Sequence, residues 1–163
     1  MLSIQEISDR LEIQDLLARY CDALDRKDWA IFDRIFTPDA VIDYTAMGGS
    51  CGDLTATKKF LADTMPMFAS YQHLVGSTVL DIEGDTARAR TICHNPMLWS
   101  DGDDPAMFVC GLWYRDELVR TPDGWRIRSR IEERSYLKNL APFGVSPASR
   151  QPARPAGQEE PAG

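Results

Sequence analysis

Apolar residues near the N-terminus recur every three or four positions, a spacing that predicts an amphipathic helix. Ser3 and Glu6 match the S-x-x-E capping box found at helix N-termini, so the helix is expected to begin there. The polar run at residues 26–28 interrupts the pattern. The apolar stripe of this helix consists of Ile4, Ile7, Leu11, Leu17, Tyr20 and Leu24.

A second, short helix is predicted over Trp29–Phe36, where large apolar residues again fall at helical spacing and a Thr-Pro-Asp sequence follows. Val41–Tyr44 is a short strand candidate, and Met47–Asp53 is predicted to be a loop. A third helix is predicted from about Leu54 to Ser70, and Pro66 is expected to kink it or end it early.

The second half of the chain alternates apolar and polar residues, as half-buried β-strands do. Glu83-Gly84-Asp85 and the Pro-Asp-Gly sequence at residues 122–124 are turn signals between them. The predicted strands are His73–Ile82, Thr86–Trp99, Met107–Val119 and Trp125–Leu137, with a polar loop at Gly102–Pro105. We therefore predict an α+β cone, in which a curved, mixed or antiparallel sheet wraps around three N-terminal helices and leaves an internal apolar pocket.

The length of 163 residues fits one domain with a substantial core. We place it at residues 1–144, because residues 145–163 hold almost no large apolar side chains and are expected to form a disordered tail. The net charge of −7 argues against nucleic acid and an anionic membrane as partners.

The N-terminus lacks the pattern of a secretory signal, and no apolar run approaches the length of a membrane span. The four cysteines show no CxxC spacing that would indicate a zinc or redox site. We therefore expect a cytoplasmic protein with reduced thiols, and a disulfide between two of the cysteines stays an open alternative.

His73 and His94 are the only histidines, and histidine is the side chain that exchanges protons near neutral pH. A carboxylate held against one ring nitrogen would fix the tautomer and make the other nitrogen more basic. Our hypothesis is that Asp25 holds His73 in this way inside the pocket, with Asp22 as the competing carboxylate. The alternative is that both histidines are structural and that Asp25 is a solvated residue at a helix end.

The segments IQDLLARYCDALDRKDWAIFDRIFTPDAVIDY, YQHLVGSTVLDIEGDTARAR and GWRIRSRIEERSYL resemble the SnoaL-like branch of the NTF2-like superfamily. The resemblance covers about residues 3–140 and is strongest with its scytalone dehydratase, bile-acid 7α-dehydratase and hexachlorocyclohexane dehydrochlorinase members. It implies a His–Asp dyad of His73 and Asp25 that works without metal or cofactor. It also implies a pocket tyrosine at Tyr20, an arginine directed at the leaving group at Arg130, and a second pocket histidine at His94.

Each of the added residues has a structural alternative. Tyr20 lies on the apolar stripe, so its ring can simply belong to the core. His94 can be hydrogen-bonded within the sheet. Arg130 alternates with Arg126, Arg128 and Glu132 on what would be a solvated strand face opposite Trp125, Ile127 and Ile131. A β-bulge or a subunit interface would be needed to bring Arg130 inside.

Together these features predict a cofactor-independent lyase of the dehydratase type. Its substrate would be a small apolar cyclic molecule such as a polyketide, a steroid-like compound or an aromatic-pathway intermediate. An isomerase or cyclase that uses the same base is one alternative, and a non-catalytic subunit or binding module is another. We expect a homo-oligomer, with a trimer ahead of a dimer, and an adaptable pocket wall formed by Met47, Met65, Met67 and Met97.

Overall fold

The computed structural model describes residues 1–99 and 106–139. The predicted loop at Gly102–Pro105, the boundary at residue 144 and the predicted tail lie outside this part. Its helices are α1 (Ile4–Arg26), α2 (Phe32–Ile35) and α3 (Leu54–Thr64), with short 3-10 turns η1 (Thr45–Met47) and η2 (Met65–Met67). Its strands are β1 (Phe36–Asp43), β2 (Cys51–Gly52), β3 (Phe68–Tyr71), β4 (Leu74–Glu83), β5 (Thr86–Trp99), β6 (Met107–Thr121) and β7 (Gly124–Lys138).

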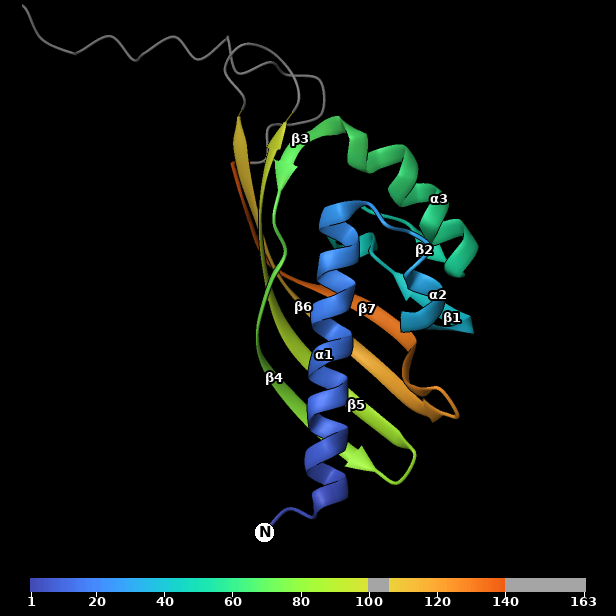
Figure 1. Cartoon of the computed structure of the whole chain (residues 1–163). Helices are drawn as coiled ribbons and strands as arrows, with labels where there is room; N and C mark the ends of the chain where they lie inside the picture. Colours follow the sequence, from blue (N-terminus) through green and yellow to red (C-terminus); the bar gives the residue numbers. More distant parts are fainter. Residues whose placement is uncertain (100–105, 140–163) are drawn as a thin grey trace, which may run out of the picture.

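The strands form one seven-stranded sheet in the order β2-β1-β7-β6-β5-β3, and β4 also pairs with β5. The pairing of β1 with β7 is parallel, and the other pairings are antiparallel. The sheet curves around α1, and α3 lies at the end of the molecule away from the N-terminus (Figure 1). The predicted α+β class with helices inside a curved, mixed sheet is confirmed. Among the described residues, no helix is both long enough and apolar enough to cross a membrane.

The predicted capping box starts α1: the Ser3 hydroxyl accepts a hydrogen bond of 3.1 Å from the Glu6 backbone N–H. The predicted apolar stripe is wrong in the first turns, where Ile4, Ile7 and Leu11 are exposed. Asp9 is the buried residue there instead. It is buried because other elements supply partners for its carboxylate, and a search for apolar spacing does not reveal such partners.

That carboxylate joins α1 to the β6–β7 hairpin. The Arg120 guanidinium donates to both Asp9 oxygens at 2.6 and 2.7 Å, and the Trp125 indole donates to one of them at 3.2 Å. The Arg120 guanidinium holds the pKa of Asp9 well below its usual range. This network anchors the first half of α1 against the sheet.

Two predicted helices are shorter than expected. The one predicted over Trp29–Phe36 is reduced to α2, because Phe36 adopts an extended backbone and pairs with Ile127 as the first residue of β1. The third helix ends at Thr64, before Pro66, as predicted from the proline. Its expected last residues instead form β3, which adds to β5.

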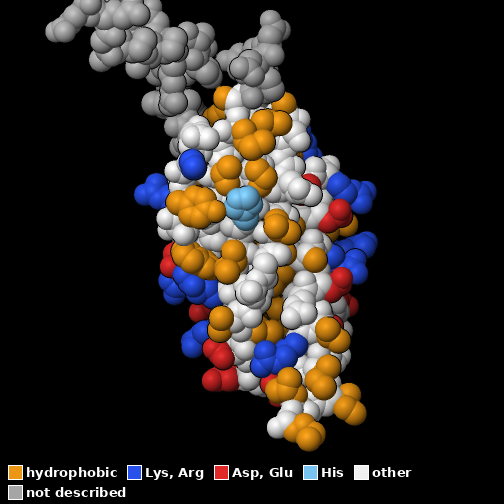
Figure 2. Space-filling view, turned by 90° about the vertical axis from the view of Figure 1, so that its left-hand side faces the viewer, with side chains coloured by type: hydrophobic (Ala, Val, Ile, Leu, Met, Phe, Trp, Pro, Cys, Tyr) orange, Lys and Arg blue, Asp and Glu red, His pale blue; other side chains and the backbone are white. Residues whose placement is uncertain are grey.

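The outer face of the sheet carries apolar side chains that no other element of the described chain covers. Figure 2 shows hydrophobic side chains gathered around an exposed histidine on this side of the molecule. The exposed ones include Leu74 and Val79 from β4, Ile92 from β5, and Ile131 and Tyr136 from β7.

Candidate active site

An apolar cavity of about 380 Å³ lies between the helices and the inner face of the sheet. The four methionines of the predicted wall, Met47, Met65, Met67 and Met97, all line it, together with aromatic side chains that include Phe60, Phe68, Trp99 and Phe108. Its polar lining includes Tyr20, Tyr44, His73, Asn95, Glu132 and Arg134. An apolar hollow with a few convergent polar groups is the usual form of a small-molecule site.

His73 and Asp25 contact each other at this cavity. The Nδ1 atom of His73 lies 2.7 Å from Oδ1 of Asp25, and the backbone N–H of His73 donates to both carboxylate oxygens at 3.1 and 3.2 Å. The histidine side chain is only 8% exposed. Because the carboxylate accepts from Nδ1–H, neutral His73 presents the lone pair of Nε2 on its other side. The predicted pairing is present in the structure.

The end of α1 and the start of β4 position this pair. Asp25 lies in the last turn of α1, which ends where Lys27 adopts a left-handed conformation and donates its N–H to Ala23 and Leu24 carbonyls. The negative end of the helix dipole disfavours a carboxylate there. The bonds from His73, which directly precedes β4, offset this cost.

Tyr71 supports the same junction. Its hydroxyl donates to the Leu24 carbonyl at 3.3 Å, and its ring meets the His73 ring edge-to-face, with centroids 5.9 Å apart. Burial raises the pKa of Tyr71 to about 12, and the Asp25 charge adds to the increase. Tyr71 therefore remains a neutral donor at working pH.

Asn95 is a site residue that the sequence reasoning missed. Its side-chain nitrogen lies 2.8 Å from Nε2 of His73, so the amide donates to the lone pair of the neutral ring. Its Oδ1 atom is buried and has no hydrogen-bond partner among the residues that the structure describes. The signal was available in the alternation of β5, because Cys93 and Met97 are the inward residues on either side of Asn95.

The prediction that His94 enters the pocket is wrong. Its side chain is exposed on the outer face of the sheet, where it is paired with Leu74 and Gly111. Successive side chains of a strand point to opposite faces, so the inward position of Asn95 sends His94 outward.

Tyr20 belongs both to the core and to the cavity wall. It is 1% exposed, and its hydroxyl forms a 2.6 Å hydrogen bond with the hydroxyl of Tyr44, a second residue that the sequence reasoning missed. Burial raises the pKa of Tyr20 above its usual value, and the nearby Arg130 guanidinium opposes the increase. The two phenols are therefore neutral and can offer hydrogen bonds to a bound oxygen.

Arg130 points inward because β7 contains the bulge that such a placement requires. Glu117 pairs with Ser129 but Leu118 pairs with Ile127, so Arg128 is an extra residue in the strand. The bulge reverses the alternation that follows, so Ile131, which was expected on the apolar face, is exposed.

The Arg130 guanidinium is fully buried behind the cavity wall. It donates two hydrogen bonds of 2.7 Å to the two oxygens of Asp116. It also lies 3.9 Å and 4.2 Å from the ring centroids of Tyr20 and Tyr114. Arg130 is not among the residues that line the cavity, so it does not face a leaving group directly, and its charge acts through the Tyr20 ring.

The structural alternative for Arg130 placed Glu132 beside it on a solvated strand face, and the structure contradicts that placement of Glu132. The same bulge turns it inward, and it lines the cavity. Burial raises the pKa of Glu132 to about 8, the Arg130 guanidinium opposes that increase, and the Asp43 carboxylate adds to it.

A model of the SnoaL-like domain matches residues 5–131. The chain belongs to the SnoaL-like domain family. An uncharacterized protein of Mycobacterium tuberculosis is 49% identical over 140 residues, which cover 86% of this chain and 95% of that protein.

Solved structures support the SnoaL-like fold. A “putative aromatic ring hydroxylase” of Novosphingobium aromaticivorans is 26% identical with a TM-score of 0.74, covering 81% of this chain and 93% of that one. A “putative scytalone dehydratase” of the same organism is 16% identical with a TM-score of 0.74, covering 89% and 96%. A hexachlorocyclohexane dehydrochlorinase is 18% identical with a TM-score of 0.71, covering 88% and 96%.

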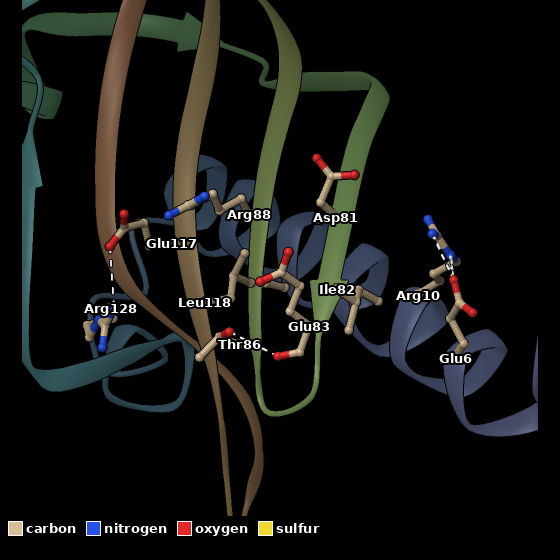
Figure 3. Close-up of a pocket in the computed structure, with 11 residues that line it drawn as sticks. Glu6, Arg10, Asp81, Ile82, Glu83, Thr86, Arg88, Glu117, Leu118 and Arg128 are labelled. Carbon is tan, nitrogen blue, oxygen red and sulfur yellow. Dashed lines mark hydrogen bonds and ion pairs between the residues drawn. The ribbon is translucent and has the colours of Figure 1, made fainter.

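A second hollow of this SnoaL-like chain, of about 470 Å³, lies away from the dyad. Figure 3 shows charged side chains from α1, β4, β5, β6 and β7 around it. Several are already paired with each other, as in the Arg10–Glu6 and Arg128–Glu117 contacts. Because it lacks an apolar wall, it is a weaker small-molecule site than the cavity that holds His73.

The cysteines add no nucleophile to the SnoaL-like site. All four are free, which closes the alternative of a disulfide. Burial raises the pKa of Cys93 to about 11 and those of Cys21 and Cys110 to about 12. Since the thiolate is the reactive form, these three thiols are inert at neutral pH.

Proposed function

We propose that this SnoaL-like protein is a cofactor-independent lyase that removes water from a small apolar cyclic molecule. The observation that carries the proposal is the 2.7 Å contact between His73 and Asp25 at the wall of an apolar cavity. A buried imidazole held by a carboxylate is the arrangement of a general base that works near neutral pH.

His73 takes a proton from the substrate carbon next to a carbonyl. In this structure the Asn95 amide donates a hydrogen bond to the Nε2 lone pair of His73. The substrate C–H replaces this amide when the molecule enters. Asp25 keeps the ring in the required tautomer and stabilises the imidazolium that forms, as a carboxylate does for the histidine of catalytic triads.

The Tyr20–Tyr44 pair receives the carbonyl oxygen of the substrate. One phenol donates to the other across 2.6 Å, which leaves one proton to donate into the cavity, toward an enolate oxygen. The Arg130 charge behind the Tyr20 ring favours negative charge at this point. General base catalysis supplies about 10²–10⁴-fold acceleration, so positioning and these electrostatic contacts supply the rest.

The decisive experiment compares the two histidines. We would incubate the protein with β-hydroxycyclohexanone and follow the loss of one water by mass spectrometry. His73→Ala should nearly abolish turnover and retain the wild-type circular dichroism spectrum, whereas His94→Ala, on the outer face, should behave like wild type. Equal activity in His73→Ala and wild type contradicts the proposal.

Product mass also separates the alternatives. An isomerase or cyclase with the same base leaves the substrate mass unchanged. A non-catalytic subunit, a role to which the structural likeness to a “putative aromatic ring hydroxylase” draws attention, turns over none of the probes and co-purifies with a larger iron-containing partner.

A further inference from the structure

The elimination lacks an assigned acid for its leaving group. Hydroxide is a poor leaving group, so a hydroxyl departs more readily when it receives a proton in the same step. His94 is on the opposite face of the sheet, and Arg130 is buried behind Tyr20 and bound to Asp116. Neither predicted group reaches the cavity.

Glu132 is the carboxyl group that lines the same cavity as His73. Its carboxyl forms no hydrogen bond with residues 1–99 or 106–139. The Arg130 guanidinium donates to Asp116 through Nε and Nη2, and its buried Nη1 has no hydrogen-bond partner among these residues. A carboxyl group in such surroundings keeps its proton and has no protein acceptor for it, so the proton is available to a bound molecule.

The surroundings of Glu132 also place it near the phenol pair. Its charge raises the pKa of Tyr20, Tyr44 and Tyr114, so Glu132 acts electrostatically on all three phenols. The charged and titratable groups that face it are Tyr20 from α1, Asp43 and Tyr44 at the end of β1, Cys93 from β5, Cys110 and Tyr114 from β6, and Arg130 from β7, with Arg134 in the same cavity lining.

We propose that the Glu132 carboxyl is the acid that protonates the departing hydroxyl, a role that rests on the proposed function of His73 as the base. His73 Nε2 accepts the proton from carbon, and the C–H electron pair becomes the new C=C bond. The C–O bond breaks toward oxygen, which takes the Glu132 proton and leaves as water. The imidazolium and the carboxylate that remain are reset when one proton passes from His73 to Glu132 through solvent.

The protonation of Glu132 is measured without any substrate. Infrared difference spectra recorded from pH 5 to pH 9 should show a carboxylic acid C=O band that persists to about pH 8 in the wild type. The band should be missing in Glu132→Gln and present in Glu133→Gln, the adjacent carboxyl, which is bonded to Arg90 on the other face. A wild type without this band overturns the assignment to Glu132 and leaves the role of His73 intact.

The role in catalysis is measured by changing the leaving group. The probes are β-hydroxycyclohexanone and the same ring with a β-(p-nitrophenoxy) group, whose anion departs without a proton. Glu132→Gln should lower kcat/KM for the hydroxy compound by about 10²–10⁴-fold and leave the nitrophenoxy compound nearly unchanged. His73→Ala should lower both.

The outcomes separate the two proposals. If Glu132→Gln lowers both rates equally, or lowers neither, Glu132 is not the acid. If the wild type converts neither ketone, or His73→Ala converts both at the wild-type rate, the proposed function itself is contradicted.

Discussion

The Asp25 carboxylate binds His73 twice, through the ring at 2.7 Å and through the backbone N–H at 3.1 and 3.2 Å. The backbone bonds fix the distance between α1 and the start of β4, and the ring bond fixes the tautomer. The orientation of the base is therefore tied to the position of its own peptide bond.

Asp25→Asn should lower kcat by on the order of 10³–10⁴-fold, because an amide can hold the ring in the wrong tautomer and cannot stabilise the imidazolium. ¹⁵N NMR of the imidazole should show a change of the protonated nitrogen in the neutral ring. Asp22→Asn is the matched control, since Asp22 lies one turn earlier, is exposed and forms an ion pair with Arg26 at 3.5 Å. If Asp22→Asn is the variant that loses activity, the dyad is assigned to the wrong carboxylate.

The buried Arg130–Asp116 ion pair should contribute much more to the free energy of unfolding than the neighbouring, half-exposed Arg128–Glu117 pair. Asp116→Asn should lower the free energy of unfolding by about 3–5 kcal/mol, because it leaves a buried guanidinium without its counter-charge. Glu117→Gln, which breaks the half-exposed 3.4 Å pair with Arg128, should cost less than about 1 kcal/mol. Urea unfolding of both variants measures this, and similar midpoints would show that Asp116 is not the main partner of Arg130.

Glu132 should make stability depend on pH. Its folded-state pKa of about 8 lies above the ordinary value of 4.5, so the unfolded chain loses this proton first as pH rises. The folded state is thereby destabilised progressively between about pH 4.5 and 8, by up to about 1.4 kcal/mol per pH unit. Glu132→Gln should therefore match the wild type near pH 4 and be the more stable protein at pH 8.

The control for this pH dependence is Glu133→Gln. The hydrogen bond from Arg90 lowers the pKa of Glu133, so its contribution to stability is present above the ordinary pKa and is lost as pH falls through the lowered value. Its variant should gain no stability at pH 8. Thermal unfolding at several pH values tests both variants, and a Glu132→Gln curve parallel to the wild type would contradict a neutral Glu132.

We expect the apolar outer face to pack against further copies of the chain, in a trimer first and a dimer second, because large exposed apolar patches mark interaction surfaces. Light scattering measures the mass in solution. Ile92→Lys on this face should shift the protein toward the monomer, whereas Ile7→Lys should not, although Ile7 on α1 is equally exposed at 46% against 45%. A monomeric wild type at micromolar concentration would contradict the expectation.

Local signals predicted most of the fold. The hairpin turn at Gly84, where φ is +60°, and the capping box at Ser3 follow from residues adjacent in sequence. The extent of α2 and the presence of β3 could not be predicted in this way. Both depend on hydrogen bonds with strands that are distant in sequence. These bonds hold the backbone extended where the local sequence favours a helix.

The candidate site was predictable only in part, for the same reason. The His73–Asp25 pair came from the family resemblance, and the structure brings the two groups together. His94 was predicted in the pocket where the structure has Asn95, because neighbouring residues of a strand point to opposite faces of the sheet. The inward position of Glu132 depends on an extra residue in β7, which can be detected only from the register with β6.

That extra residue at position 128 makes the cavity lining sensitive to the length of β7. A point substitution around the cavity changes one side chain at a time. The gain or loss of a single residue at position 128 would instead turn the side chains that follow it in β7 to the opposite face of the sheet. Arg130 and Glu132 would then face solvent, and their neighbours in β7 would face the cavity. A change of length in this hairpin would thus alter the lining of the cavity more than any single substitution.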